Sequence, residues 1–263
     1  MNITLDHIDC VAQQLPCTRH MKKIISIMSL SVLIMTSGAC GGGSDSNTGS
    51  DTDAGAGGGG GGGGPGGVRP PNQGMDFVYP TTAYTGFDGT NTYKVPVGTN
   101  LTNVTWTIDD PTIADIAAVA APTGTQFSRF GGTWAMVTTK KEGTTKITAT
   151  GGGKTVTAAL VVTTYTTANL AVGDTRYNTP DDATAAQRAS CASCHKLTNG
   201  ADHSPLVLEW YKDDEILSAV TTGVYPAAAG GYVLQGVNHA WNLTDAEKLG
   251  IVPYLRALPP RGF

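Results

Sequence analysis

The chain has 263 residues, a net charge of −4 and only 14% charged residues. A composition this poor in basic residues excludes a basic nucleic-acid surface and a polybasic membrane-binding stripe. Any contact with a membrane must therefore come from an apolar segment or a covalent lipid.

The first 40 residues have the composition of a leader. Residues 1–20 show no pattern that predicts a folded element, and we interpret them as an over-extended start that precedes Met21. Lys22 and Lys23 follow Met21, and residues 24–35 are an apolar run that is too short to span a bilayer stably. This pattern predicts an export signal peptide over residues 21–40.

The end of this leader resembles the lipobox of bacterial lipoproteins. It reads Ser37-Gly38-Ala39-Cys40, and it departs from the usual pattern at Ser37, where a larger aliphatic residue is common. The resemblance implies lipidation at Cys40 and a lipoprotein of the cell envelope, facing the periplasm or exposed at the surface. The non-acidic Gly41 favours the outer membrane over the inner one. An ordinary cleaved signal with an incidental cysteine is the alternative.

Residues 41–74 are dominated by Gly, Ser, Asp and Thr and include an unbroken glycine run at 57–64. Such a composition cannot build a core, so we expect a disordered Gly/Ser-rich linker. A flexible coil of some thirty residues reaches about 30 Å. The segment would act as a tether between the anchor and the folded part.

Residues 75–166 have the pattern of an all-β structure. Apolar and polar residues alternate at 104–108, 144–150 and 156–162, which is the period of a half-buried strand. Gly151, Gly152 and Gly153 lie between the last two runs and predict a hairpin turn.

The same segment resembles bacterial Ig-like domains of group 2. The resemblance rests on Trp106-Thr-Ile-Asp-Asp-Pro, then Glu142-Gly-Thr-Thr-Lys-Ile147, and a closing Val-rich strand. It implies an Ig-like β-sandwich with Trp106 and Ile147 in the core, and a module that is a spacer or binds a partner.

The strongest chemical signal is the pentapeptide Cys191-Ala-Ser-Cys194-His195. Cys-x-x-Cys-His is the spacing that attaches c-type haem: each thiol bonds to a vinyl group, and the imidazole ligates the iron. A redox dithiol or half of a zinc site is less consistent with the context, because a βαβ setting and a second paired ligand spacing are not evident. Two of the five cysteines precede Met21, one is the anchor and two bind haem, so none remains for a disulfide framework.

Residues 167–263 carry helix signals around this motif. Thr179 followed by Pro180 predicts a helix that runs toward Cys191, and residues 213–223 predict a second helix closed by Gly223. Thr244 and Glu247 form a capping-box pattern that opens a third. The predicted apolar stripe of that helix is Leu249, Val252, Leu255 and Leu258.

This last part resembles single-haem class I cytochromes c. The resemblance rests on the haem motif, on Leu243-Thr-Asp-Ala-Glu247 and on Tyr254-Leu-Arg-Ala-Leu258, with Pro253 as a departure that predicts a kink or a late break. It implies an all-α cytochrome c fold with one covalent haem c. It also implies that a backbone carbonyl at Pro205 accepts a hydrogen bond from His195.

The second axial ligand departs from that family. All six methionines lie at or before Met136, so a methionine ligand from this part is excluded. His239 occupies the expected position, and His203 is the rival. Two imidazoles predict a low-potential, six-coordinate iron, and Trp241 is expected to line the haem pocket.

The sequence thus predicts a multidomain chain: an all-β Ig-like sandwich at 75–166 and an all-α cytochrome c fold at 167–263, after the linker. The expected function is electron transfer with a redox partner protein rather than enzyme catalysis. Two alternatives stay open: a five-coordinate haem binder or peroxidase-like protein, and an adhesion lipoprotein in which the haem is ancillary.

Overall fold

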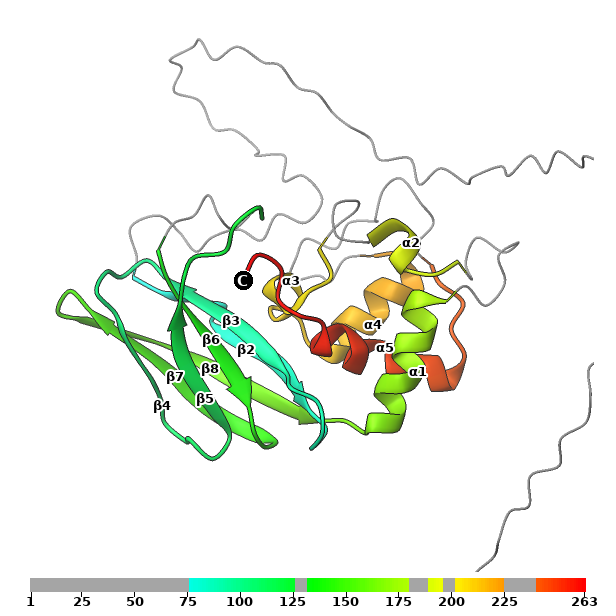
Figure 1. The fold of residues 1–263 in the computed structure, drawn as a ribbon, viewed down its shortest axis with the longest axis horizontal. Coiled ribbons are helices and arrows are strands. Elements are labelled where there is room, and N and C mark those ends of the chain that lie inside the picture. The colour runs from blue at the N-terminus through cyan, green and yellow to red at the C-terminus, as the bar shows by residue number, and fades with distance from the viewer. Residues whose placement is uncertain (1–75, 126–131, 180–188, 196–201, 225–239) are drawn as a thin grey trace, which may run out of the picture. The chain divides into compact units, whose positions relative to one another are not determined.

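The computed structural model describes residues 76–125, 132–179, 189–195, 202–224 and 240–263 (Figure 1). Five predictions fall outside these residues: the extension at 1–20, the leader at 21–40 with Cys40, the linker at 41–74, the helix expected from Pro180 toward Cys191, and the axial candidate His239.

The strands of the described residues form two four-stranded sheets. The first has the order β1-β3-β6-β5, with every pair antiparallel. The second has the order β2-β8-β7-β4, in which β2 and β8 are parallel and the other pairs antiparallel. The strands are β1 (Val78–Tyr79), β2 (Thr82–Phe87), β3 (Lys94–Thr99), β4 (Thr105–Ile108), β5 (Ala114–Val119), β6 (Thr133–Thr139), β7 (Gly143–Gly151) and β8 (Lys154–Thr164).

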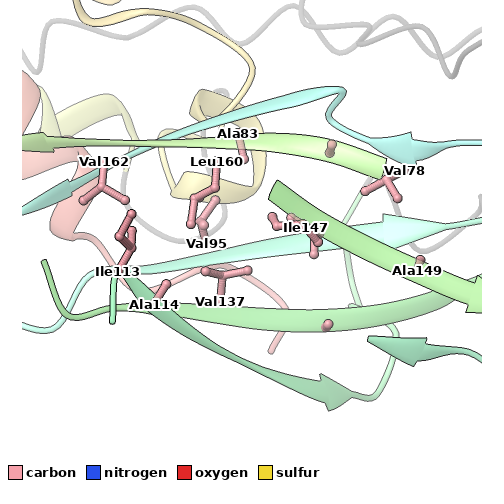
Figure 2. Close-up of a cluster of buried hydrophobic side chains, with 13 residues drawn as sticks. Val78, Ala83, Val95, Ile113, Ala114, Val137, Ile147, Ala149, Leu160 and Val162 are labelled. Carbon is pink, nitrogen blue, oxygen red and sulfur yellow. The ribbon is translucent and has the colours of Figure 1, made fainter. Parts of the chain in front are cut away.

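The main cluster of buried side chains in the sandwich is aliphatic. Figure 2 shows side chains such as Val95, Ile147 and Leu160 clustered between the strands, and all three are fully buried. Trp106 is only partly buried and packs against this cluster. The cluster consists of Val78, Ala83, Val95, Val97, Ile113, Ala114, Ala135, Val137, Ile147, Ala149, Ala158, Leu160 and Val162.

The three alternating runs of the sequence lie in β4, β7 and β8. The last two strands form the predicted hairpin, in which Gly151 pairs with Lys154 across a two-residue turn. Gly152 and Gly153 have φ of 59° and 76°, the left-handed values that this turn requires.

The helices of the described residues all follow the strands in the chain. They are α1 (Thr167–Asn178), α2 (Ala192–His195), α3 (Pro205–Leu208), α4 (Asp213–Thr222) and α5 (Asp245–Ala257). As predicted, α4 ends at Gly223, which has φ 69°. Thr244 and Glu247 cap α5 reciprocally, with N to O distances of 2.7 and 3.3 Å.

Two expectations about the helices are corrected by the structure, and a third is untested. Thr179 caps the end of α1, where its N–H donates to the Thr175 carbonyl at 2.9 Å. The helix expected from Pro180 toward Cys191 stays a prediction, because residues 180–188 lie outside the described part of the chain. Leu249 was expected on the buried stripe, but it is 63% exposed, while Ile251 is buried in the cluster that holds Val252 and Leu255. At Pro253 a kink or a late break was expected, and the break does not occur, because α5 continues through Pro253 to Ala257.

Helices α1 and α5 cross at a pair of glycines. A side chain on Gly250 would come within 2.6 Å of the backbone of α1, and one on Gly173 would collide with the Gly250 carbonyl. The absence of a Cβ at both positions therefore permits this close crossing.

Hydrogen bonds, from both backbone and side chains, join the helical part to the sandwich. The Tyr84 N–H of edge strand β2 donates to the Glu209 carbonyl at 2.9 Å, directly after α3. The Thr123 N–H donates to the Gly262 carbonyl at 3.1 Å, and the Tyr165 hydroxyl donates to Asp213 at 2.6 Å.

The predicted fold class, an all-β Ig-like sandwich followed by an all-α cytochrome c fold, is wrong. Strands prevail over helices in the described residues, two of the five helices are single turns, and an all-α cytochrome c fold is not seen there. The physical reason is that the sequence signals were local. A haem motif and capping boxes specify a site and the ends of helices, whereas a fold is fixed by how elements pack.

Within the described part of the chain, no helix combines the length and the apolar character needed to cross a bilayer.

Candidate functional site

The residues of the haem motif wind into one helical turn. The His195 N–H donates to the Cys191 carbonyl at 3.1 Å, and the Ser193 hydroxyl donates to the Ser190 carbonyl at 2.6 Å. Because α2 ends at His195, the first thiol and the imidazole are one turn apart and share a face. The side chain of Cys194 lies outside the described set.

The thiol of Cys191 is buried in the apolar cluster of the helical part, which we call the thiol cluster. Cys191 is 8% exposed, and burial raises the pKa of its thiol, an effect that the nearby Arg176 guanidinium opposes. The thiol therefore stays protonated to higher pH than an exposed one. The buried members are Tyr177, Cys191, Ala192, Ile216, Leu243, Ile251, Val252 and Leu255.

Trp241 is partly buried and packs against this cluster. Its expected role in lining a haem pocket stays a prediction. The backbone N–H of Trp241 donates to the Val220 carbonyl at 3.0 Å, which fixes the segment before α5 to the end of α4. The ring lies 5.5 Å from the guanidinium carbon of Arg176. At this distance the cation attracts the face of the indole.

His195 and His203 lie beside each other. Their ring centroids are 3.7 Å apart with 25° between the planes, so the imidazoles are stacked. Two imidazoles that bind one metal from opposite sides point their nitrogens at it, each at about 2.0–2.1 Å for zinc. In the stacked arrangement His203 is thus not placed across a metal from His195.

Pro205 begins α3 and is buried. Its carbonyl accepts the Glu209 N–H at 3.0 Å, as in the first turn of a helix. The predicted bond from the His195 imidazole to this carbonyl stays a prediction.

Three buried charged residues of the helical part were not foreseen. Arg176 and Arg256 are fully buried, and Glu209 is 1% exposed with its Oε2 lacking a hydrogen bond. Desolvation raises the pKa of Glu209 well above 4.5, and the Arg256 guanidinium opposes this shift. Arg256 donates to the Leu208 and Tyr211 carbonyls and to Asp213. The partners of these three buried residues are distant in the sequence, so local sequence patterns could not predict their burial.

The residues described at the motif fit a covalently bound haem. Thioether attachment needs a thiol that faces an apolar surface, and Cys191 lies in one. Iron ligation needs an imidazole within a turn of that thiol, and His195 is there. The described residues contain no group of three His, Cys, Asp or Glu side chains that could hold a metal ion, but a haem requires only axial ligands from the protein.

Comparison with known proteins finds no matching family model and no matching curated protein. Solved structures of the S-layer protein SbsC are similar over 34% of this chain. Domains 4 and 5 have 22% identity, 44% of that chain covered and a TM-score of 0.24. Domains 5–6 have 22% identity, 42% covered and the same TM-score. The chain spans less than half the length of these structures.

Proposed function

We propose that this chain is a c-type cytochrome in the functional sense, an electron-transfer protein with one haem c held through Cys191 and Cys194. The observation that supports it best is the buried Cys191 thiol within the apolar thiol cluster, one helical turn before His195. The proposal concerns the cofactor and its use, and it does not require the cytochrome c fold.

When bound, the haem supplies a one-electron iron couple. Cys191 and Cys194 would fix it to the chain, and His195 would be an iron ligand. His239 would be the second ligand, with His203 as the rival. A second imidazole in place of a methionine thioether keeps the reduction potential low.

The apolar residues near Cys191 would exclude water from the iron. Tyr177 is buried beside the thiol, and burial, with a smaller contribution from Cys191, raises its pKa to about 12. It therefore stays neutral at physiological pH and adds no charge to the site. Trp241 would cover another part of it.

We also propose that residues 21–40 export the chain and that Cys40 anchors it by lipid in the cell envelope, with the outer membrane favoured. The linker at 41–74 would then let the folded part reach a redox partner protein, and the sandwich would act as a spacer or docking module. Incorporation of labelled palmitate by the wild-type chain, but not by Cys40→Ser, tests the anchor.

The decisive experiment is expression of the full chain with a c-type maturation system. Intact mass should show one added haem, and a pyridine haemochrome spectrum should show saturated thioether linkages. The variant with Cys191→Ala and Cys194→Ala is expected to carry no covalent haem. Colourless wild-type protein would refute the proposal.

The iron ligands are tested on the same protein. Ligation by two imidazoles predicts weak binding of carbon monoxide and cyanide, and His239→Ala should open the iron to both, whereas His203→Ala should not. A wild-type protein that binds them tightly would favour the five-coordinate, peroxidase-like alternative.

A further inference from the structure

Arg176 is a buried cation next to the haem motif, and the proposed function has not used it. It is 2% exposed and belongs to α1, which lies outside the motif. Its guanidinium Nη1 donates to the Ala189 carbonyl at 2.8 Å. Because Ala189 is two residues before Cys191, this bond fixes the backbone that leads directly into the buried thiol.

The same guanidinium is held by a second element. Arg176 Nε lies 3.7 Å from Glu247 Oε1, and the other carboxylate oxygen of Glu247 accepts the Thr244 N–H at 2.7 Å. Glu247 is thus tied to the start of α5 and to Arg176 at once. Together with the Trp241 ring at 5.5 Å, these contacts join α1, the Ala189 backbone and the segment that opens α5.

A role in packing alone does not explain an arginine here. Burying a guanidinium is costly unless its donors are used, and a hydrophobic residue of similar volume is often as stable in place of a buried ion pair. The arginine adds a directional hydrogen bond. A planar, charged donor group fixes the carbonyl that it binds more strictly than packing does.

We propose that Arg176 is a positioning residue for the attachment of haem at Cys191, acting through the Ala189 carbonyl to hold the thiol in the thiol cluster. This inference rests on the proposed function. In the attachment step the S–H of Cys191 adds across a vinyl C=C bond. A C–S bond and a C–H bond form while the S–H bond and one π bond break, so no oxidant or reductant is consumed.

The test compares four full-length proteins made with the c-type maturation system: wild type, Glu247→Gln, Arg176→Met combined with Glu247→Gln, and Arg176→Lys. The double variant removes the guanidinium without leaving the partly buried carboxylate of Glu247 deprived of its cation. Glu247→Gln alone is the matched control, since it loses the ion pair but keeps the bond to Ala189. Each protein is denatured and alkylated, and fragment masses then show whether Cys191 is a thioether or a labelled free thiol.

The double variant should retain haem at Cys194 while the fraction with a thioether at Cys191 falls about tenfold, the lower end of what loss of an outer-shell partner costs at metal sites. Its pyridine haemochrome band should move to longer wavelength, because the unreacted vinyl group stays conjugated with the ring. Glu247→Gln should attach haem at both cysteines. Arg176→Lys, which keeps one charged donor group, should restore part of the attachment at Cys191.

Full attachment at Cys191 in the double variant would overturn the inference, as would an equal loss in Glu247→Gln alone. If the double variant does not accumulate, Arg176→Gln with Glu247→Gln takes its place under the same criteria. Failure of the proposed function gives a different result, since the wild-type chain itself would then lack covalent haem.

Discussion

The interior of the sandwich and the interior of the helical part bury different kinds of side chain. The buried members of the main sandwich cluster are all Ala, Val, Ile or Leu, and the other fully buried side chains of the sandwich, such as Trp134 and Tyr93, carry no charge. The helical part buries a thiol, with Arg176, Arg256 and Glu209 also inaccessible. An aliphatic core stabilises a fold without offering chemistry, whereas buried ionisable groups reduce stability unless they are paired. The comparison is consistent with the proposal that the helical part carries the haem.

The largest expected effect tests the sandwich half of this comparison. Leu160→Ala removes a fully buried side chain from the centre of the sandwich, and such truncations cost about 3 kcal/mol. Urea unfolding followed by tryptophan fluorescence would measure the loss. Haem attachment at Cys191 should be unchanged in the folded fraction, and a parallel loss of attachment would contradict the division of roles.

The second prediction concerns the buried acid of the helical part. Because desolvation raises the pKa of Glu209 well above 4.5, the folded chain keeps this proton at pH values where the unfolded chain has lost it. The contribution of Glu209 to the free energy of unfolding should therefore be largest below about pH 4.5. This contribution should fall as the pH rises toward the pKa of Glu209 in the folded chain.

Glu209→Gln should abolish that pH dependence and stabilise the protein at pH 8, which denaturation curves at pH 5 and 8 would show. Glu215, which is on the exposed side of the cap of α4, supplies the control Glu215→Gln. An identical pH profile for wild type and Glu209→Gln would show that Glu209 is ionised inside the fold.

A smaller effect is expected at the start of α5. Thr244→Ala removes the acceptor of the Glu247 N–H, and loss of such a cap costs about 1 kcal/mol. Thermal unfolding would detect this loss, and Thr244→Ser, which keeps the hydroxyl, should be close to wild type. A Thr244→Ala protein as stable as the wild type would show that tertiary contacts alone fix this helix end.

The smallest effect is predicted at the surface of the sandwich. Asp76 and Lys154 form an ion pair at 2.8 Å, and exposed pairs are worth less than about 1 kcal/mol. Asp76→Asn should therefore change the free energy of unfolding by less than the error of a urea titration. A clear destabilisation would mean that this surface ion pair contributes substantially to the stability of the sandwich, in addition to its buried core.

The two parts also differ in how far the sequence predicted them. The period-two runs identified β4, β7 and β8, whose alternate residues face solvent, and the glycines identified the hairpin between the last two. Strand β3 carries no such signal, because five of its six residues are buried and the alternation disappears. Its assignment depends on pairing with β1 and β6, which no local pattern encodes.

In the helical part the sequence predicted the ends of α4 and α5 but not the fold. The haem site stays a prediction, and the structure shows only that Trp241 packs against the cluster that holds Cys191. Helix α1 was not foreseen as a separate element: it is rich in Thr, Ala and Asn and depends on the cap at Thr166 and on packing against α5. The buried Arg176 could not be predicted, since its partner Glu247 is far along the chain.

The hydrogen bond from Tyr84 to the Glu209 carbonyl has a consequence for solubility. Strand β2 is at the edge of its sheet, where unpaired backbone groups can recruit a strand from another molecule. The segment after α3 occupies one of those groups. Helical residues thereby shield an exposed border of the sandwich, and a truncated chain that ends before them would be prone to self-association and aggregation.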